Sequence, residues 1–167
     1  MRPAVAADLP LLAAIEDAGG PQFSAYFGAA TEPVLVAPAP DGRQRAGEPG
    51  FLLVAGSPPV GFVHVLVIDG AHAHLEQLSV LPDQQRRGIG RALVDAAVEE
   101  ARRQGFERLS LCTYRDVPWN GPYYRSLGFR EVAEADLAPY ERRLRDHERD
   151  LRLDVNGVRC VMEVALG

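Results

Sequence analysis

The sequence contains no lysine, and all its side-chain positive charge apart from histidine comes from 18 arginines. The absence of lysine excludes a lysine amine as a nucleophile. Arginine stays ionised and forms paired hydrogen bonds with phosphates. With 23 acidic residues the net charge is −5, so the broad positive charge typical of a nucleic-acid-binding protein is missing. We expect no nucleic-acid partner.

Cysteine is also scarce, since Cys112 and Cys160 are the only two in 167 residues. They are too few for a disulfide scaffold and lack the spacing of a metal site. No apolar run approaches the roughly 20 residues that a membrane-spanning helix needs, and residues 1–8 lack the apolar core of a secretory signal. We expect a single domain over residues 1–167, in the cytoplasm, with no membrane partner and no metal.

The order of the predicted elements indicates a mixed α/β fold. Short apolar runs between turn residues predict strands, at 51–55, 60–68, 71–80, 108–113, 129–132 and 159–165. Helical spacing and capping residues predict helices, at 8–19, 90–104 and 121–127. A short helix is expected after residue 20, followed by a loop over 38–49. The charged segment 140–152 predicts a solvated helix or arm.

Two local signals predict finer detail. Asp8 is expected to cap the first helix. Asp69-Gly70 predicts a two-residue hairpin turn, which places Ile68 opposite Ala71 and Val63 opposite Glu76. In that register, His64 lies on the face of the sheet opposite to His74.

A glycine-rich segment, Gln85-Arg86-Arg87-Gly88-Ile89-Gly90, joins the predicted strand that ends at Pro82 to the helix that follows. Glycine lets a ligand approach the backbone closely, and the free amides at a helix N-terminus attract anions. Arg86, Arg87 and Arg91 add positive charge. The segment therefore predicts a pyrophosphate site, although such turns also serve packing alone. It matches neither the dinucleotide-binding fingerprint nor the P-loop.

The segment Gln85–Gly90 resembles the signature of the GNAT superfamily of acyl-CoA-dependent N-acetyltransferases. A second segment, Tyr123-Tyr124-Arg125-Ser126-Leu127-Gly128-Phe129, resembles another motif of that superfamily. The resemblance covers nearly the whole chain. It implies a mostly antiparallel, twisted sheet flanked by helices and splayed between its fourth and fifth strands. It also implies an enzyme that moves an acetyl group from acetyl-CoA to a primary amine by direct attack in a ternary complex.

The same resemblance implies which residues bind the coenzyme. The pyrophosphate is expected at Gln85, Arg86, Arg87, Gly88, Ile89, Gly90 and Arg91. The pantetheine arm is expected to pair with the strand edge at Leu78, Ser79 and Val80, as an added strand does. Backbone amides near that edge could polarise the thioester carbonyl.

Two side chains are candidates for catalysis. The resemblance implies that Tyr124 protonates or hydrogen-bonds the CoA sulfur, whereas the alternative is a packed helix aromatic. Glu76 shares a strand face with His74 by alternation, and this pair could accept a proton from the amine through water. The alternative for Glu76 is a solvent-facing strand residue. Some relatives carry a glutamate near the end of the fifth strand, where this chain has Cys112 and Thr113, which weakens any base assignment taken from them.

Asn120 departs from the family pattern. Many relatives place a CoA-contacting asparagine seven residues before the tyrosine, where this chain has Val117. Asn120 stands only four before Tyr124 and is expected to be the N-cap of the helix over 121–127, with CoA contact as the lesser alternative. His72 and His74 alternate in a strand but lack a third metal ligand. Trp119 could line the acceptor pocket or simply pack.

No motif in the sequence identifies the acceptor. A small-molecule amine is our first hypothesis, and a peptide or protein N-terminus is the second. A CoA-binding or sensing module without turnover remains an alternative. So does another donor such as succinyl-CoA, for which Arg115 or Arg125 could bind the extra carboxylate. The fold also allows a homodimer, which no residue pattern here decides.

Overall fold

The computed structural model describes all residues from 1 to 167 and contains a seven-stranded sheet in the order β1-β2-β3-β4-β5-β7-β6. The strands are β1 (Arg2–Pro3), β2 (Gly50–Gly56), β3 (Pro59–Val67), β4 (His72–Val80), β5 (Arg108–Tyr114), β6 (Arg130–Glu131) and β7 (Arg159–Ala165). Every neighbouring pair is antiparallel except β4 and β5, which are parallel. The predicted fold class, a mixed and mostly antiparallel sheet, is confirmed.

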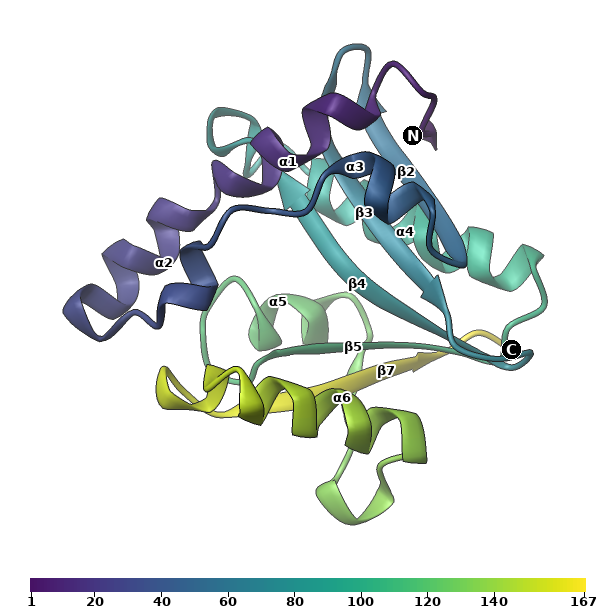
Figure 1. The fold of residues 1–167 in the computed structure, drawn as a ribbon. Helices are drawn as coiled ribbons and strands as arrows, with labels where there is room; N and C mark the ends of the chain where they lie inside the picture. Colours follow the sequence, from purple (N-terminus) through teal and green to yellow (C-terminus); the bar gives the residue numbers. More distant parts are fainter.

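Six α-helices flank the sheet: α1 (Leu9–Asp17), α2 (Gly20–Phe27), α3 (Gly42–Ala46), α4 (Ile89–Arg103), α5 (Gly121–Ser126) and α6 (Pro139–Asp150). Short 3-10 turns are η1 (Gly28–Ala30), η2 (Pro33–Val36), η3 (Pro82–Gln84), η4 (Glu134–Asp136) and η5 (Leu153–Val155). Figure 1 shows α4 behind the sheet, with α1 and α3 in front of β2 to β4 and α6 in front of β5 and β7. No helix combines the length and apolar character needed to cross a bilayer.

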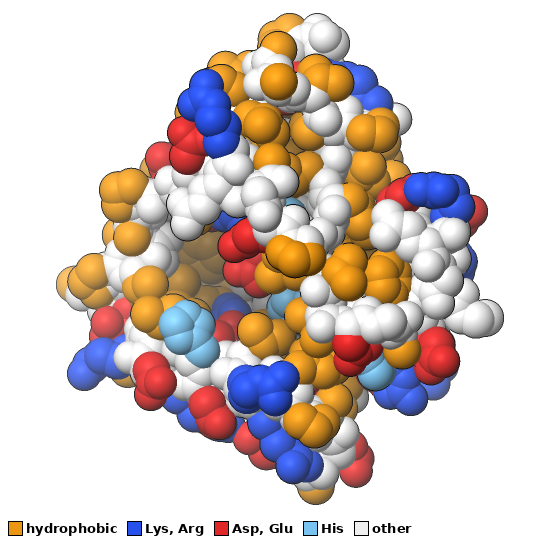
Figure 2. All heavy atoms as spheres, turned by 45° about the vertical axis from the view of Figure 1, so that its right-hand side comes forward, with side chains coloured by type: hydrophobic (Ala, Val, Ile, Leu, Met, Phe, Trp, Pro, Cys, Tyr) orange, Lys and Arg blue, Asp and Glu red, His pale blue; other side chains and the backbone are white.

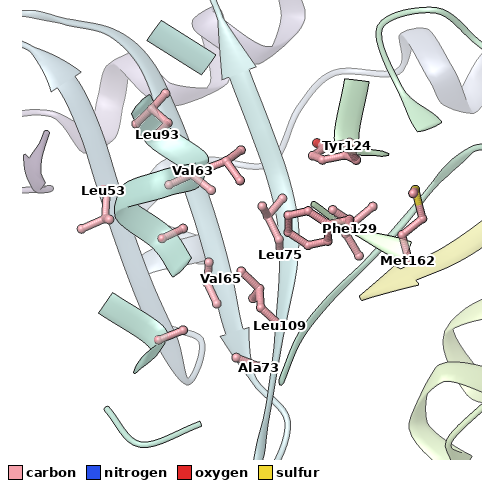
Figure 3. Close-up of a cluster of buried hydrophobic side chains, with 14 of the residues drawn as sticks. Leu53, Val63, Val65, Ala73, Leu75, Leu93, Leu109, Tyr124, Phe129 and Met162 are labelled. Atoms are coloured by element: carbon pink, nitrogen blue, oxygen red, sulfur yellow. The ribbon is translucent and has the colours of Figure 1, made fainter. Parts of the chain in front are cut away.

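Two apolar clusters cover the two faces of the sheet. Along β3, Val63 and Val65 point to one face of the sheet, whereas Phe62 points to the other. Val63 and Val65 join the larger cluster with Leu93 of α4, and that cluster continues to Tyr124 and to β7 (Figure 3). Phe62 joins the smaller cluster under α1. Each large side chain removed from water contributes on the order of 1.5–3 kcal/mol, which holds the helices against the sheet.

The predicted register of β3 and β4 is wrong. Val63 lies opposite Leu78, and Glu76 is the extra residue of a β-bulge, because the pairing shifts between His64 and Val65. The turn also exceeds two residues, because the Ile68 amide donates to the His72 carbonyl and three residues lie between them. The Asp69 carboxylate accepts the amides of Ala71 and His72 within this turn. An extra residue reverses the facing of the strand beyond it. His64 and His74 therefore lie on the same face, contrary to our expectation.

Three further local predictions are corrected. The Asp8 carboxylate does not cap α1 but binds Arg2 at 2.6 Å and the amide of Val5 at 2.8 Å. The expected loop over 38–49 contains α3, whose N-cap is Asp41. The charged segment 140–152 forms most of α6, and one of its faces is buried through packing on β7.

Candidate active site

The sheet splits between its two parallel strands. β4 and β5 pair only where His72 to His74 lie beside Arg108 to Ser110, and beyond these residues the strands diverge (Figure 1). A cleft of about 980 Å³ opens at the divergence. Figure 2 shows a hollow in the molecular surface with acidic side chains at its edge. Beyond these residues, the edge of β4 that faces β5 is therefore left without a paired strand.

Most of the predicted site residues line this one cleft. They are Glu76, Leu78, Ser79, Val80, Gln85, Arg86, Gly88, Gly90, Arg91, Asn120 and Tyr124. Two members of the glycine-rich segment do not line it, because Arg87 is exposed and Ile89 packs against the larger core cluster. The tertiary structure thus brings together residues that lie almost fifty positions apart in the chain.

The backbone before α4 is shaped for an anion. Arg86 and Gly88 have positive φ angles of 62° and 80°, and Gln85 donates to the carbonyl oxygen of Val80 at 3.1 Å. None of the amides from Arg86 to Arg91 donates to a backbone carbonyl. Successive free amides in such conformations form a concave anion site. Arg86 and Arg91 add charge at its edge.

The inner edge of β4 presents free backbone groups. The amide of Leu81 donates to Val60 of β3. Hydrogen-bonding direction alternates along an antiparallel strand, so the amides of Leu78 and Val80 point away from β3, toward the split. No strand pairs with β4 there. An extended ligand could therefore form a ladder with this edge.

Tyr124 lines the cleft from α5, although its ring belongs to the core. The ring packs 5.3 Å from Tyr123 and 5.7 Å from Phe129, measured between ring centroids, and Figure 3 shows it at the end of the apolar cluster. Burial raises the pKa of the Tyr124 hydroxyl. The hydroxyl is therefore protonated at neutral pH and able to donate.

Glu76 stands at the bulge of β4, where its carboxylate is 44% exposed to the cleft. Its Oε2 atom lies 3.9 Å from Nε2 of His74, so the two side chains share one face of the strand, as expected, but form no hydrogen bond. Desolvation by the cleft walls raises the pKa of Glu76, and the charge of Arg45 opposes that rise. A carboxylate with a raised pKa is a better proton acceptor than an ordinary glutamate.

The neighbouring polar residues have defined partners. His72 Nδ1 lies 2.8 Å from Asp69, whereas His74 Nδ1 lies 2.9 Å from Ser110. Asn120 occupies the N-cap position of α5 but its side chain makes no capping bond, which contradicts the predicted role. Its backbone carbonyl accepts the Tyr124 amide, and its side chain lines the cleft without a hydrogen bond to the protein.

The far end of the cleft holds two acidic residues that the sequence analysis did not select. Glu16 and Asp17 line it from α1, and nothing in the sequence distinguishes them from other helix acids. Phe23 of α2 meets Trp119 at a centroid distance of 5.8 Å, and both line the cleft. Trp119 therefore both packs and lines the cleft, and its contact with Phe23 depends on tertiary packing.

These features, an open strand edge in a split sheet beside free amides at a helix N-terminus, are those of an acyltransferase fold. The Acetyltransferase (GNAT) family model matches residues 16–129. The chain belongs to this family and is an N-acetyltransferase, as the two motifs predicted.

Solved structures share the fold at low sequence identity. N-acetylglutamate synthase from Neisseria gonorrhoeae, complexed with coenzyme A and N-acetyl-glutamate, is 18% identical with a TM-score of 0.63; the match covers 99% of this chain but 34% of that one. PaiA N-acetyltransferase from Thermoplasma acidophilum, complexed with coenzyme A, is 16% identical with a TM-score of 0.68, covering 98% and 96%. The ribosomal-protein-S18-alanine N-acetyltransferase from Escherichia coli is 21% identical with a TM-score of 0.62, covering 99% and 92%.

Proposed function

We propose that this protein transfers the acetyl group of acetyl-CoA to the primary amine of a small molecule, by direct attack in a ternary complex. One observation carries the proposal. A single cleft contains the open edge of β4, the free amides before α4, the buried phenol of Tyr124 and the accessible carboxylate of Glu76. An acyl-CoA donor needs the first two features, and amine transfer needs the last two.

The coenzyme fits the cleft in a defined direction. Its pyrophosphate is placed at the amides of residues 86–91, with Arg86 and Arg91 beside it. The pantetheine arm continues along Leu78 and Val80, whose amides point toward the split. This direction brings the thioester toward Tyr124 and Glu76. An amide on the β4 edge can then hold the thioester oxygen as charge develops on it.

Acetyl transfer requires two proton movements. The neutral amine attacks the thioester carbon, a carbon–nitrogen bond forms, and Glu76 accepts the amine proton directly or through water. The intermediate then collapses with loss of the carbon–sulfur bond, and Tyr124 donates a proton to the departing CoA thiolate. Both residues return to their starting states by exchange with solvent. The products are the N-acetylated amine and CoA.

The acceptor end of the cleft favours a cation with an apolar body. Asp17 and Glu76 line it beside Glu16, whose charge is paired with Arg45 at 2.7 Å, so an ammonium group is attracted there before it loses its proton. Phe23 and Trp119 offer aromatic surface to the rest of the molecule.

Hydrogen bonds between the segments that follow α2 and α6 support a small acceptor over a peptide. Asn156 accepts the amide of Glu32 at 2.8 Å and donates to the carbonyl of Ala30 at 2.6 Å. Arg152 adds a contact with Glu32 at 3.3 Å. These bonds tie the segment after α2 to the segment after α6, and a long polypeptide would have to displace them.

Neither arginine considered for a succinyl group supports that donor. Arg115 pairs with Asp116 at 3.2 Å, and Arg125 donates to the Arg115 carbonyl at 3.1 Å. Neither residue lines the cleft. We therefore assign the donor as acetyl-CoA.

A thermal-shift titration with acetyl-CoA, succinyl-CoA, free CoA and NADH tests the donor site. Ligand at 100 times its dissociation constant adds about 2.7 kcal/mol to stability, so the CoA species should raise the melting temperature and NADH should not. Release of CoA thiol is then measured against a panel of aromatic, aliphatic and polyamine acceptors and short peptides. Binding of acetyl-CoA without transfer to any amine would favour a sensing module, and preferred transfer to peptides would overturn the small acceptor.

A further inference from the structure

One part of the cleft lining packs only loosely on the rest of the molecule. Residues 20–37, here called the α2–η2 segment, contain α2, η1 and η2, and none of these elements has a buried residue. The segment packs on itself, because a β-carbon at Gly20 would lie 3.7 Å from the Val36 side chain. Both ends of the segment line the cleft, and Figure 1 shows α2 on the left, beyond the strands.

The inner side of the α2–η2 segment rests on two aromatic rings. Phe23 lies 6.3 Å from Tyr114 and 5.8 Å from Trp119, and Phe27 lies 5.4 Å from Tyr114, measured between ring centroids. Phe23 also lines the cleft, at the end that we assign to the acceptor. Apolar attraction is not directional, so these ring contacts do not by themselves fix where Phe23 lies.

Directional bonds to the α2–η2 segment come from two residues after α6. The hydrogen bonds that the segment makes with the chain beyond residue 39 all end on Asn156 or Arg152. Asn156 Oδ1 accepts the Glu32 amide at 2.8 Å, and its Nδ2 donates to the Ala30 carbonyl at 2.6 Å. A backbone amide only donates and a carbonyl only accepts, so these partners also fix the orientation of the Asn156 side chain.

Asn156 is itself held in place by the sheet and by α6. It directly follows η5, in which the Leu153 carbonyl accepts the Tyr114 hydroxyl at 2.8 Å. The Asp154 carboxylate of η5 accepts from the buried guanidinium of Arg145 at 2.7 Å. These two bonds tie η5 to β5 and α6, so the amide group of Asn156 is presented from a well-anchored part of the molecule.

The ion pair beside Asn156 contributes less. Arg152 Nη2 lies 3.3 Å from Glu32, but the Arg152 side chain is 69% exposed. Exposed ion pairs contribute little to stability, whereas the two bonds of Asn156 are made to backbone groups and have defined directions. We therefore expect the amide of Asn156, and not the charge of Arg152, to fix the α2–η2 segment.

We propose that Asn156 is a positioning residue for the acceptor: its two hydrogen bonds hold the α2–η2 segment against η5 and so keep Phe23 in the lining of the cleft. The inference rests on the proposed function, in which this end of the cleft binds the amine. Asn156 does not line that cleft, so it acts through the segment and not by contact with the substrate. It makes no hydrogen bond to β4 or to the turn before α4, where the coenzyme is assigned.

Hydrogen–deuterium exchange measures the positioning without an activity assay. Asn156→Ala removes both bonds, so amides of residues 28–37 should exchange about tenfold faster, whereas those of β5 and α6 should keep wild-type rates. Asn156→Asp keeps an oxygen for the Glu32 amide but cannot donate to Ala30, so its exchange should be intermediate. Unchanged exchange in Asn156→Ala would overturn the proposal.

Two neighbouring variants serve as controls. Val155→Ala truncates an adjacent side chain that is 57% exposed and should keep wild-type exchange. Arg152→Met removes the exposed ion pair and should accelerate exchange less than Asn156→Ala does. A larger effect of Arg152→Met would assign the segment to the ion pair and would overturn the role of Asn156.

Steady-state kinetics connects the segment with the acceptor. For the best amine of the acceptor panel, Asn156→Ala should raise the KM about tenfold, in keeping with the loss of two ordinary hydrogen bonds. The kcat and the dissociation constant for acetyl-CoA should stay at wild-type values, and Asn156→Asp should restore part of the KM. A general folding defect would instead weaken acetyl-CoA binding and lower kcat together.

The inference and the proposed function fail differently. If the wild-type protein acetylates no amine of the panel, the proposed function is wrong and the acceptor role of Asn156 falls with it. If the wild type is active but Asn156→Ala exchanges faster with an unchanged KM for the amine, only the role of Asn156 is wrong. Circular dichroism and the thermal shift with acetyl-CoA establish that each variant is folded and binds the donor.

Discussion

Gly90 lies directly against the phenol of Tyr123, so close that a β-carbon at position 90 would stand 3.0 Å from the Tyr123 hydroxyl oxygen. The contact joins the two sequence motifs, which are about thirty residues apart in the chain. The Tyr123 hydroxyl is buried and has no hydrogen-bond partner. A side chain at position 90 would therefore have to displace the Tyr123 ring by a few tenths of an ångström.

This contact predicts a compensating pair of substitutions. Gly90→Ala should destabilise the fold by about 1–3 kcal/mol through overpacking and weaken acetyl-CoA binding. Tyr123→Phe removes the oxygen, and the next ring atom is 3.8 Å away, so the double variant should regain most of the stability. Thermal melts with and without acetyl-CoA measure both effects. Equal destabilisation by Gly90→Ala in the two backgrounds would show that the contact is not the cause.

Tyr124→Phe should lower kcat by about 10²-fold, because general acid catalysis typically contributes at least that much. The ring remains in its apolar site, so the dissociation constant for acetyl-CoA should stay unchanged. The exposed Tyr26 of α2 provides a control, since Tyr26→Phe also removes one hydroxyl but lies outside the cleft wall. CoA-thiol release and thermal shift are the two measurements. A variant with unchanged kcat would remove Tyr124 from the mechanism.

Stability should fall as the pH drops below 7. His64 and His74 are buried, and desolvation lowers the pKa of each to about 4. The unfolded chain binds protons at about pH 6.5 whereas the folded chain does not, so unfolding is favoured as the pH falls toward 4. Between pH 7 and pH 5 each histidine should account for about 2 kcal/mol of the loss.

Urea denaturation at pH 7 and at pH 5 measures that loss. His64→Gln and His74→Gln should each reduce the difference between the two pH values. His72→Gln, at a partly exposed position, should leave it unchanged. The same pH dependence in all four proteins would contradict the assignment.

The buried guanidinium of Arg45 should be sensitive to loss of its charge. Its Nη2 atom lies 2.7 Å from Glu16, its Nη1 atom lies 3.3 Å from His64, and its side chain is 7% exposed. Arg45→Met leaves the Glu16 carboxylate without its partner and should cost about 3–5 kcal/mol. Adding Glu16→Gln should recover part of this loss, measured by urea denaturation. Arg43→Met on the same helix is the control, because Arg43 is exposed, and it should change stability by less than about 0.5 kcal/mol.

Local sequence signals were sufficient for the glycine-rich turn and for most elements. Gly88 adopts a positive φ and α4 begins directly after it. Both features depend on neighbouring residues, so the sequence by itself determined them. The family was predicted from two local motifs, Gln85–Gly90 and Tyr123–Phe129.

Long-range packing decided the rest. The bulge at Glu76 depends on how β4 fits β3, so a turn signal six residues away predicted the wrong register. The buried face of α6 depends on β7, which follows it in the chain. Hydrogen bonds link His74, Ser110 and Tyr140, which come from three separate elements. Composition and spacing describe neighbours along the chain, whereas these three residues become neighbours only when β4, β5 and α6 pack together.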